Sequence, residues 1–231
     1  MIGFFQRLVD LVAPRACPVC GQRMTTQETV CCVKCWLDLP RTRFENNFFE
    51  NETAQMFWGL MPVEKCYSMF RYQSHGKLSR IVEQFKYHDH PEYCLELGRV
   101  MAQTLKATDF AADIDVVIPV PLTKKRFRNR GYNQSELLAK GFVEIIQKPL
   151  ILDAIARQHF QQSQTRLGRV ERQENTSGAF VLRKGEQVRG KRVLLIDDVI
   201  TTGATLRACG EQLLAAGAKE LNILTLAIAK V

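Results

Sequence analysis

The sequence is organised by residues 193–205, where a run of apolar residues passes directly into two acids and then into a turn rich in threonine. A continuous apolar run of this kind predicts a strand that is buried on both faces, as in a parallel sheet. A helical pattern follows, with Leu206, Cys209, Leu213 and Leu214 on one side. Because ligands of open α/β sheets bind outside the carboxyl ends of the strands, the stretch predicts a binding site at this strand end.

The residue types in the turn suit a phosphorylated sugar. The free N–H groups and the positive dipole end of the expected helix favour a phosphate. Asp197 and Asp198 accept hydrogen bonds when ionised, which suits the two hydroxyls of a ribose ring. We interpret the segment as a cradle for ribose 5-phosphate, and a buried strand with an ordinary Asp-Asp turn is the alternative. The residues expected to hold the phosphate are Thr201, Thr202, Gly203, Ala204 and Thr205.

Every position of residues 193–205 fits the phosphoribosyl pyrophosphate (PRPP) fingerprint of type I phosphoribosyltransferases, which this stretch resembles. Purine-salvage members of that family carry an aspartate at the position of Thr201, so the resemblance argues against purine salvage. It also implies that Val120 and Pro121, at the end of another expected strand, contact the pyrophosphate group. The polar stretch 158–178 corresponds to the flexible hood that closes over the ligand in that family.

Length and charge limit the classes of protein that this chain can represent. A chain of 231 residues allows one large domain or a domain with an appendage. Its 32 lysines and arginines exceed its 24 acids, and the net charge of +8 suggests a polyanionic partner or a phosphorylated ligand. The sequence has no membrane span, and its first residues do not resemble a secretory signal. We therefore expect a cytoplasmic protein whose eight cysteines are reduced or metal-bound.

Two Cys-x2-Cys pairs near the N-terminus predict a tetrahedral zinc site with the ligands Cys17, Cys20, Cys32 and Cys35. The residues between the pairs are too polar to form a core, so a metal worth ~10–16 kcal/mol would have to hold this piece together. Cys31 competes for the second pair, but the spacing favours Cys32. Four sulfur ligands leave no open position, which predicts a structural zinc and not a catalytic one. Unliganded or redox-active thiols are the alternative.

A basic run follows the second expected strand end and contains no acid. A charge run is usually a solvated face, but the neighbouring diphosphate site favours a role in binding anions. Aromatic rings among the cations also match a surface for single-stranded nucleic acid, where rings stack on bases. The run therefore predicts contact with DNA or with diphosphate, and both uses stay open. Its residues are Lys124, Lys125, Arg126, Arg128, Arg130 and Tyr132.

The order of the patterns predicts the domain organisation. Strand and helix patterns alternate from about residue 112, which indicates an α/β fold with a mainly parallel sheet and helices on both faces. We assign an N-terminal helix and zinc module to residues 1–40, a linker to 41–65 and the phosphoribosyltransferase-like domain to 66–231. A long polar loop such as 158–178 is usually functional or mobile.

Further motifs narrow the resemblance. They are Lys86-Tyr87 and residues 118–121, 130–134, 164–167 and 172–175, in addition to the four cysteines and residues 193–205. With these motifs the chain is similar, over nearly its whole length, to the ComF (GntX-like) family. That family is associated with natural competence, the uptake of DNA and transformation in bacteria, on the cytosolic side of the membrane.

The resemblance implies a DNA-binding protein that handles imported single-stranded DNA and binds PRPP with magnesium, next to a structural zinc. Competence or DNA-processing proteins are the implied protein partners. The alternative is an active phosphoribosyltransferase with an unidentified acceptor, in which Asp197 and Asp198 serve catalysis. A third possibility joins the two: PRPP or a related phosphosugar binds without turnover and alters the affinity for DNA.

Overall fold

The computed structural model describes residues 15–157 and 180–229 of the chain. The start of the expected N-terminal module, residues 1–14, and the polar stretch 158–178 lie outside these residues.

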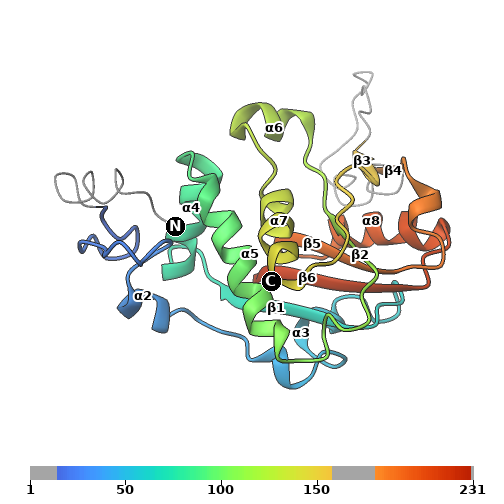
Figure 1. Cartoon of the computed structure of the whole chain (residues 1–231), viewed down its shortest axis with the longest axis horizontal. Helices are drawn as coiled ribbons and strands as arrows, with labels where there is room; N and C mark the ends of the chain where they lie inside the picture. Colours follow the sequence, from blue (N-terminus) through green and yellow to red (C-terminus); the bar gives the residue numbers. More distant parts are fainter. Residues whose placement is uncertain (1–14, 158–179, 230–231) are drawn as a thin grey trace, which may run out of the picture.

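A parallel sheet of four strands forms the centre of the molecule (Figure 1). The spatial order is β1-β6-β5-β2, and all three neighbouring pairs are parallel. This arrangement confirms the mainly parallel sheet that the sequence predicts. The strands are β1 (Cys66–Tyr72), β2 (Val116–Pro119), β5 (Arg192–Ile200) and β6 (Glu220–Ala229).

The strand pattern expected over residues 150–156 is divided between two places. Residues 149–151 continue the sheet beyond β2, because the Val117 N–H donates to Pro149 O at 2.8 Å and the Ile151 N–H donates to Val117 O at 3.0 Å. The chain then leaves the sheet and forms a small antiparallel pair, β3 (Ile155–Arg157) with β4 (Phe180–Leu182).

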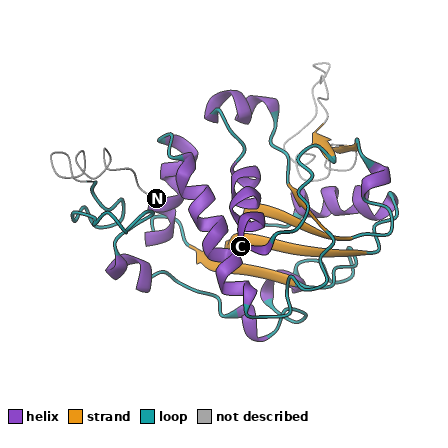
Figure 2. Ribbon diagram, viewed as in Figure 1, coloured by secondary structure: helices purple, strands orange, loops and turns teal. Residues whose placement is uncertain are grey.

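Helices cover both faces of the sheet (Figure 2). On one face α4 (Lys77–Tyr87), α5 (Pro91–Lys106) and α7 (Gln134–Ile146) bury a cluster that includes Leu194 and Ile196 of β5. On the other face α8 (Ala204–Ala215) packs on a second cluster, to which β5 contributes Val193 and Leu195. The first half of β5 therefore feeds alternate side chains into two cores, which explains its continuous apolar sequence.

The path of the chain locates the binding crevice. From β2 the chain passes through α7 to residues 149–151 at one edge, whereas from β5 it passes through α8 to β6 in the opposite direction. The carboxyl ends of β2 and β5 therefore flank a topological switch point, where open α/β sheets bind their ligands.

Strand β5 differs from the expectation at the two acids. The apolar run predicts a strand that ends at Asp197, but β5 continues to Ile200 and includes both acids. In a regular strand, side chains three positions apart point to opposite faces of the sheet. Ile196 and Val199 pack on the same cluster, so the alternation of faces is interrupted at the acids. The pairing with β6 skips Asp198. The pairing with β6 resumes at Val199 in the same register, so β5 continues past the end of the apolar run.

The N-terminal residues lie against the main body. The Arg80 guanidinium of α4 donates to the carbonyl oxygen of Val19, and the Lys77 ammonium lies 2.8 Å from Oδ2 of Asp38. Residues 40–42 cover the free edge of β1, where the Thr42 N–H donates to Met69 O at 3.1 Å. The remaining elements are α2 (Val33–Leu37), η1 (Phe44–Asn46), α3 (Glu52–Gln55), α6 (Lys124–Arg130) and η2 (Gly185–Gln187). The boundaries of the three-part division stay a prediction.

Candidate functional site

The two acids of β5 lie at the switch point and are held by partners from three directions. Oδ1 of Asp197 accepts hydrogen bonds from the Ser135 hydroxyl at 2.8 Å and from the Asp198 N–H at 2.9 Å. Oδ1 of Asp198 accepts from the Val199 N–H at 2.6 Å. The Lys86 ammonium lies 2.6 Å from Oδ2 of Asp198, and these two side chains are only 17% and 15% exposed. The carboxylates are therefore fixed before any ligand arrives.

The environment favours a proton on Asp197. Burial, and after it the charge of Asp198, raise the pKa of the Asp197 carboxyl to about 7, although the Ser135 hydrogen bond and Lys86 oppose the shift. Near neutral pH the side chain therefore exchanges between a hydrogen-bond acceptor and a donor.

The threonine turn connects β5 to α8 through Gly203. This residue has φ +73°, and a Cβ there would lie 3.3 Å from Cε1 of Phe57, so glycine is required for both backbone conformation and space. The Thr202 hydroxyl accepts from the Ala204 N–H at 3.4 Å. The side chains of the turn remain accessible: Thr201 and Thr202 are exposed, and Ala204 and Thr205 are half-buried.

Residues 132–135 join the elements around the acids. The Tyr132 hydroxyl donates to Phe85 O at the end of α4, at 2.7 Å. The Asn133 amide donates to Val120 O at the end of β2, at 3.0 Å, and Ser135 reaches Asp197 of β5. This segment therefore fixes three elements at one crevice.

Sequence reasoning missed two partners of the acids. The sequence gives no functional signal at Ser135, and it places Lys86 in a motif without a role. Both are far from the acids in the sequence, so only a fold that brings α4 and α7 to β5 reveals the contacts. The burial of the polar side chain of Ser135 marks its role in the structure, but no sequence pattern does.

The end of β2 has few free backbone donors. The Val120 N–H donates to Ile196 O at 2.9 Å, and Pro121 has no N–H. The role of Val120 and Pro121 at the pyrophosphate stays a prediction. If backbone N–H groups bind there, those of Leu122 and Thr123 are the next along the chain.

The basic run forms helix α6, which stands away from the sheet at the end of two extended segments (Figure 1). The Thr123 hydroxyl caps its start by accepting from the Arg126 N–H at 3.1 Å, and Gly131, with φ +76°, ends it. Phe127 is 49% exposed among the cations. The exposed basic side chains are Lys124, Lys125, Arg126 and Arg128.

Two members of the basic set have inward partners. The Arg130 guanidinium donates to Oε1 of Gln134 at 2.9 Å and lies 5.6 Å from the ring centre of Tyr87. Tyr132 is half-buried and bonded to α4. Arg157 of β3 is also near: burial, followed by the charge of Arg126, lowers the pKa of the Arg157 guanidinium. The charges of Arg126 and Arg157 are therefore close enough to repel each other.

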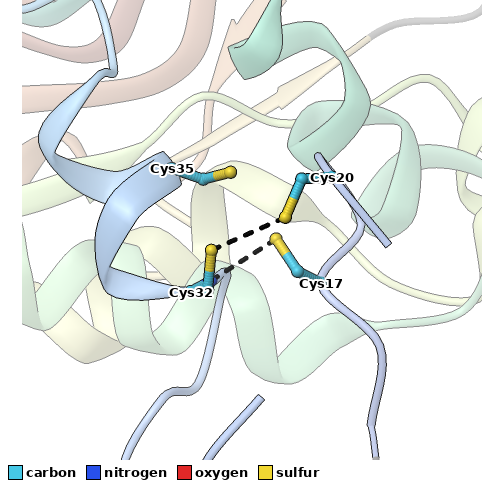
Figure 3. Close-up of side chains that lie close together, drawn as sticks. All are labelled: Cys17, Cys20, Cys32 and Cys35. Atoms are coloured by element: carbon cyan, nitrogen blue, oxygen red, sulfur yellow. Dashed lines mark hydrogen bonds between the residues drawn. The ribbon is translucent and has the colours of Figure 1, made fainter. Parts of the chain in front are cut away.

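The four cysteines expected as ligands converge on one point (Figure 3). The Sγ atoms of Cys17, Cys20, Cys32 and Cys35 all lie within 4.8 Å of one another. A tetrahedral site with Zn–S distances of ~2.3 Å separates its sulfurs by ~3.8 Å, so the cluster fits a structural metal ion. Cys31 lies outside the cluster, and burial raises the pKa of its thiol to about 12.

Backbone donors favour an anionic sulfur at one member of the cluster, Cys17. Burial opposes ionisation of Cys17, but N–H groups of Cys32, Cys20 and Val19 outweigh it and lower the pKa of the Cys17 thiol to about 7. The Cys32 N–H lies 3.4 Å from Sγ of Cys17. Because thiolates are the metal-binding form, these donors favour metal binding.

Among the described residues, no helix is both long and apolar enough to cross a membrane.

Comparison with known proteins gives one matching domain family and several relatives. Residues 84–230 match the phosphoribosyl transferase domain. Competence protein F of Haemophilus influenzae is 31% identical over 154 residues, which are 65% of this chain and 67% of that protein. DNA utilization protein YhgH of Escherichia coli is 30% identical over 149 residues, 63% of this chain and 65% of that protein. Competence protein ComFC of Bacillus subtilis is 25% identical over 201 residues, 87% of this chain and 72% of that protein.

Proposed function

Because the chain belongs to the phosphoribosyl transferase domain family, and within it to the ComF family, we propose that it serves natural competence. In this role it handles imported single-stranded DNA and binds PRPP with Mg²⁺. The observation that carries the phosphosugar part is the meeting of Asp197 and Asp198 with the Gly203 turn at the switch point of the sheet. The names of the relatives, which concern competence and DNA utilization, support the DNA part. We place this activity in the cytoplasm.

In this proposal the protein holds the sugar at both ends. The carboxylates of Asp197 and Asp198 accept hydrogen bonds from the ribose hydroxyls. The 5′-phosphate binds the threonine turn and the free N–H groups at the start of α8, which favour an anion. The diphosphate lies toward the end of β2, where the positive charges of Arg126 and Arg157 favour an anion.

Two metals complete the proposal. Zinc is the proposed ion of the four-cysteine cluster, because four sulfur donors with no open position suit a structural zinc. Mg²⁺ enters with PRPP and neutralises diphosphate oxygens, since it prefers phosphate and water oxygens to an all-protein cage. The zinc holds the N-terminal module in shape and does not take part in chemistry.

The proposed DNA contact is helix α6. Its exposed cations suit the phosphate backbone, and Phe127 offers a ring on which a base can stack. Binding of this kind is sensitive to salt: on single strands, log K falls by ~0.7 per phosphate contact for each tenfold rise in salt.

Calorimetric titration of Mg·PRPP tests the phosphosugar part. We expect binding to the wild type and a strong loss in D198N, because a neutral amide no longer pairs with Lys86 or accepts as a carboxylate does. The matched control is D38N, which breaks the Lys77 ion pair on the same helix α4 far from the acids. Absence of binding to the wild type contradicts the proposal.

One observation favours the alternative of an active phosphoribosyltransferase. Asp197, with its pKa raised to about 7, can give or take a proton at neutral pH, which is the property of a general acid or base. In this alternative an acceptor replaces pyrophosphate at the anomeric carbon of PRPP. Without an added acceptor, water takes that place and the products are ribose 5-phosphate and pyrophosphate. D198A should abolish this release of pyrophosphate. If the wild type binds PRPP but releases no pyrophosphate, the binding role stands and the enzyme role does not.

Bound PRPP can also regulate DNA binding without turnover. Because coupling between two ligands is reciprocal, PRPP would change the affinity for DNA by the same factor as DNA changes the affinity for PRPP. Equal DNA affinities with and without saturating Mg·PRPP exclude this coupling.

A further inference from the structure

Lys86 occupies a position for which the proposed function gives no role. It is the residue before the last of α4, and its side chain reaches the carboxyl end of β5 on the face that α4 covers. There its ammonium lies 2.6 Å from Oδ2 of Asp198, with both side chains less than one-fifth exposed. A charge pair with so little access to water is screened weakly by salt.

The partners of the two acids differ in charge. Asp197 accepts from two neutral donors, the Ser135 hydroxyl and the Asp198 N–H. Asp198 has one neutral donor, the Val199 N–H, and one cation. Within residues 15–157 and 180–229, Lys86 is the only cation that forms an ion pair with either acid. Arg157 responds to the charge of Asp197 but forms no ion pair with it in this part of the chain.

An ammonium at this position has two consequences. It is a compact charge with three N–H donors, so that after one bond to Asp198 it can donate to a sugar or phosphate oxygen. It also contacts Oδ2 of Asp198, one of the oxygens that a divalent cation could bind, and a second cation beside it is repelled. The acids therefore already carry their counter-ion.

We propose that Lys86 is the resident counter-cation of the sugar-binding acids, so that the ribose 5-phosphate end of the site binds its ligand without a divalent cation. This inference rests on the proposed function and deepens it: the requirement for Mg²⁺ belongs to the diphosphate group alone. Lys86 positions Asp198 and donates to the bound phosphosugar.

The test is calorimetric titration of ribose 5-phosphate, which lacks the diphosphate, in EDTA and again in Mg²⁺. The wild type should bind with the same affinity in both buffers. K86M should lose roughly 10- to 100-fold in EDTA, the range for removing one hydrogen bond to a charged group. Mg²⁺ should restore part of that loss, because the unneutralised acids of the variant then bind the ion. K86R, which keeps the charge, should retain more affinity than K86M.

The control is K77M on the same helix, which removes an ion pair of similar length, 2.8 Å, next to the cysteine cluster. It should bind as the wild type does, and thermal unfolding should verify that each variant is folded. If K86M does not fold, the wild type alone still decides, since a need for Mg²⁺ to bind ribose 5-phosphate overturns the inference.

The possible failures are distinguishable. If the wild type binds neither ribose 5-phosphate nor Mg·PRPP, the proposed function falls and the inference with it. If the wild type binds, but K86M binds equally well or is weakened by the same factor with and without Mg²⁺, Lys86 is only structural. In that case the inference is overturned and the proposed function stands.

Discussion

The cysteine cluster and the cradle at the edge of the sheet hold their ligands by opposite designs. The cluster draws four identical donors from residues 17–35 and brings all of them within 4.8 Å of one another. The cradle draws on α4, α7 and β5, and its acids are already bonded to Lys86 and Ser135. The four sulfur donors of the cluster come from one short segment and suit a structural metal. The acids of the cradle come together only in the fold, and they can exchange their hydrogen bonds to protein groups for bonds to a ligand.

Loss of a cysteine ligand should change stability more than any other substitution considered, and it should leave the cradle in place. C32S removes one ligand of four, and we expect loss of the metal and unfolding of the N-terminal module, because apparent binding of a structural zinc contributes ~10–16 kcal/mol. The neighbouring C31S is the matched control, since Cys31 is buried but lies outside the cluster. Zinc content per chain and thermal unfolding measure both. Equal zinc in the two variants would refute the ligand assignment.

The second largest effect is expected from a side chain added at Gly203, which strains the turn of the cradle. G203A places a Cβ at φ +73° and 3.3 Å from the Phe57 ring, so we expect a cost of about 1–2 kcal/mol in stability and a roughly tenfold loss of PRPP affinity. Gly190 is a matched control, with φ +69° and no atom within 4 Å of the added Cβ. G190A should lose stability and keep PRPP affinity. The comparison fails if both variants bind PRPP equally.

The third effect is a pH dependence of stability that arises from Asp197 in the cradle. The pKa of Asp197 is about 7 in the folded protein, above the ordinary 3.8, so the folded state binds more protons than the unfolded state between these values. The free energy of unfolding therefore receives a contribution from Asp197 that falls as pH rises from about 4 to about 7. Urea unfolding of the wild type and D197N at pH 5 and 7.5 measures it. The interval from pH 5 to the pKa of about 7 spans about two pH units, so we expect D197N to lose about 2–3 kcal/mol of this pH dependence. An unchanged difference would contradict the shift.

The smallest effect on stability concerns the electropositive surface. Replacement of Lys124 and Arg128 by alanine should change the free energy of unfolding by less than about 0.5 kcal/mol, because both side chains are exposed. The same variant should reduce the salt slope of single-strand binding by ~0.7 for each phosphate that it no longer neutralises. The control is K219A. Lys219 is an exposed cation beside Glu220, at the opposite end of the strands. If the variant and the wild type have equal salt slopes, α6 does not contact the DNA.

The sequence predicted the parts of each site that are local. The spacing of Cys17, Cys20, Cys32 and Cys35 was sufficient to select the cluster over Cys31, because all four ligands lie in one short segment. The alternation of strand and helix patterns likewise predicted the parallel sheet. These signals depend on neighbours in the chain, and a single sequence shows such neighbours directly.

The contacts that complete the cradle were not predictable in this way. Lys86 and Ser135 meet the acids only because α4 and α7 cover the same face of the sheet. Phe57 lies within the expected linker, yet its ring defines the space beside Gly203. The continuation of β5 through both acids was also missed, since its pairing with β6 is set by partners distant in sequence. Assembly in three dimensions, and not local propensity, determines these features.

A crystal structure with Mg·PRPP bound would show whether the paired acids and the threonine turn form the phosphosugar site. We predict that the ribose hydroxyls lie within hydrogen-bonding distance of Asp197 and Asp198, and that the 5′-phosphate lies in the turn of Thr201, Thr202 and Gly203. A ligand bound elsewhere, or acids that make no contact with the sugar, would contradict the proposed phosphosugar site.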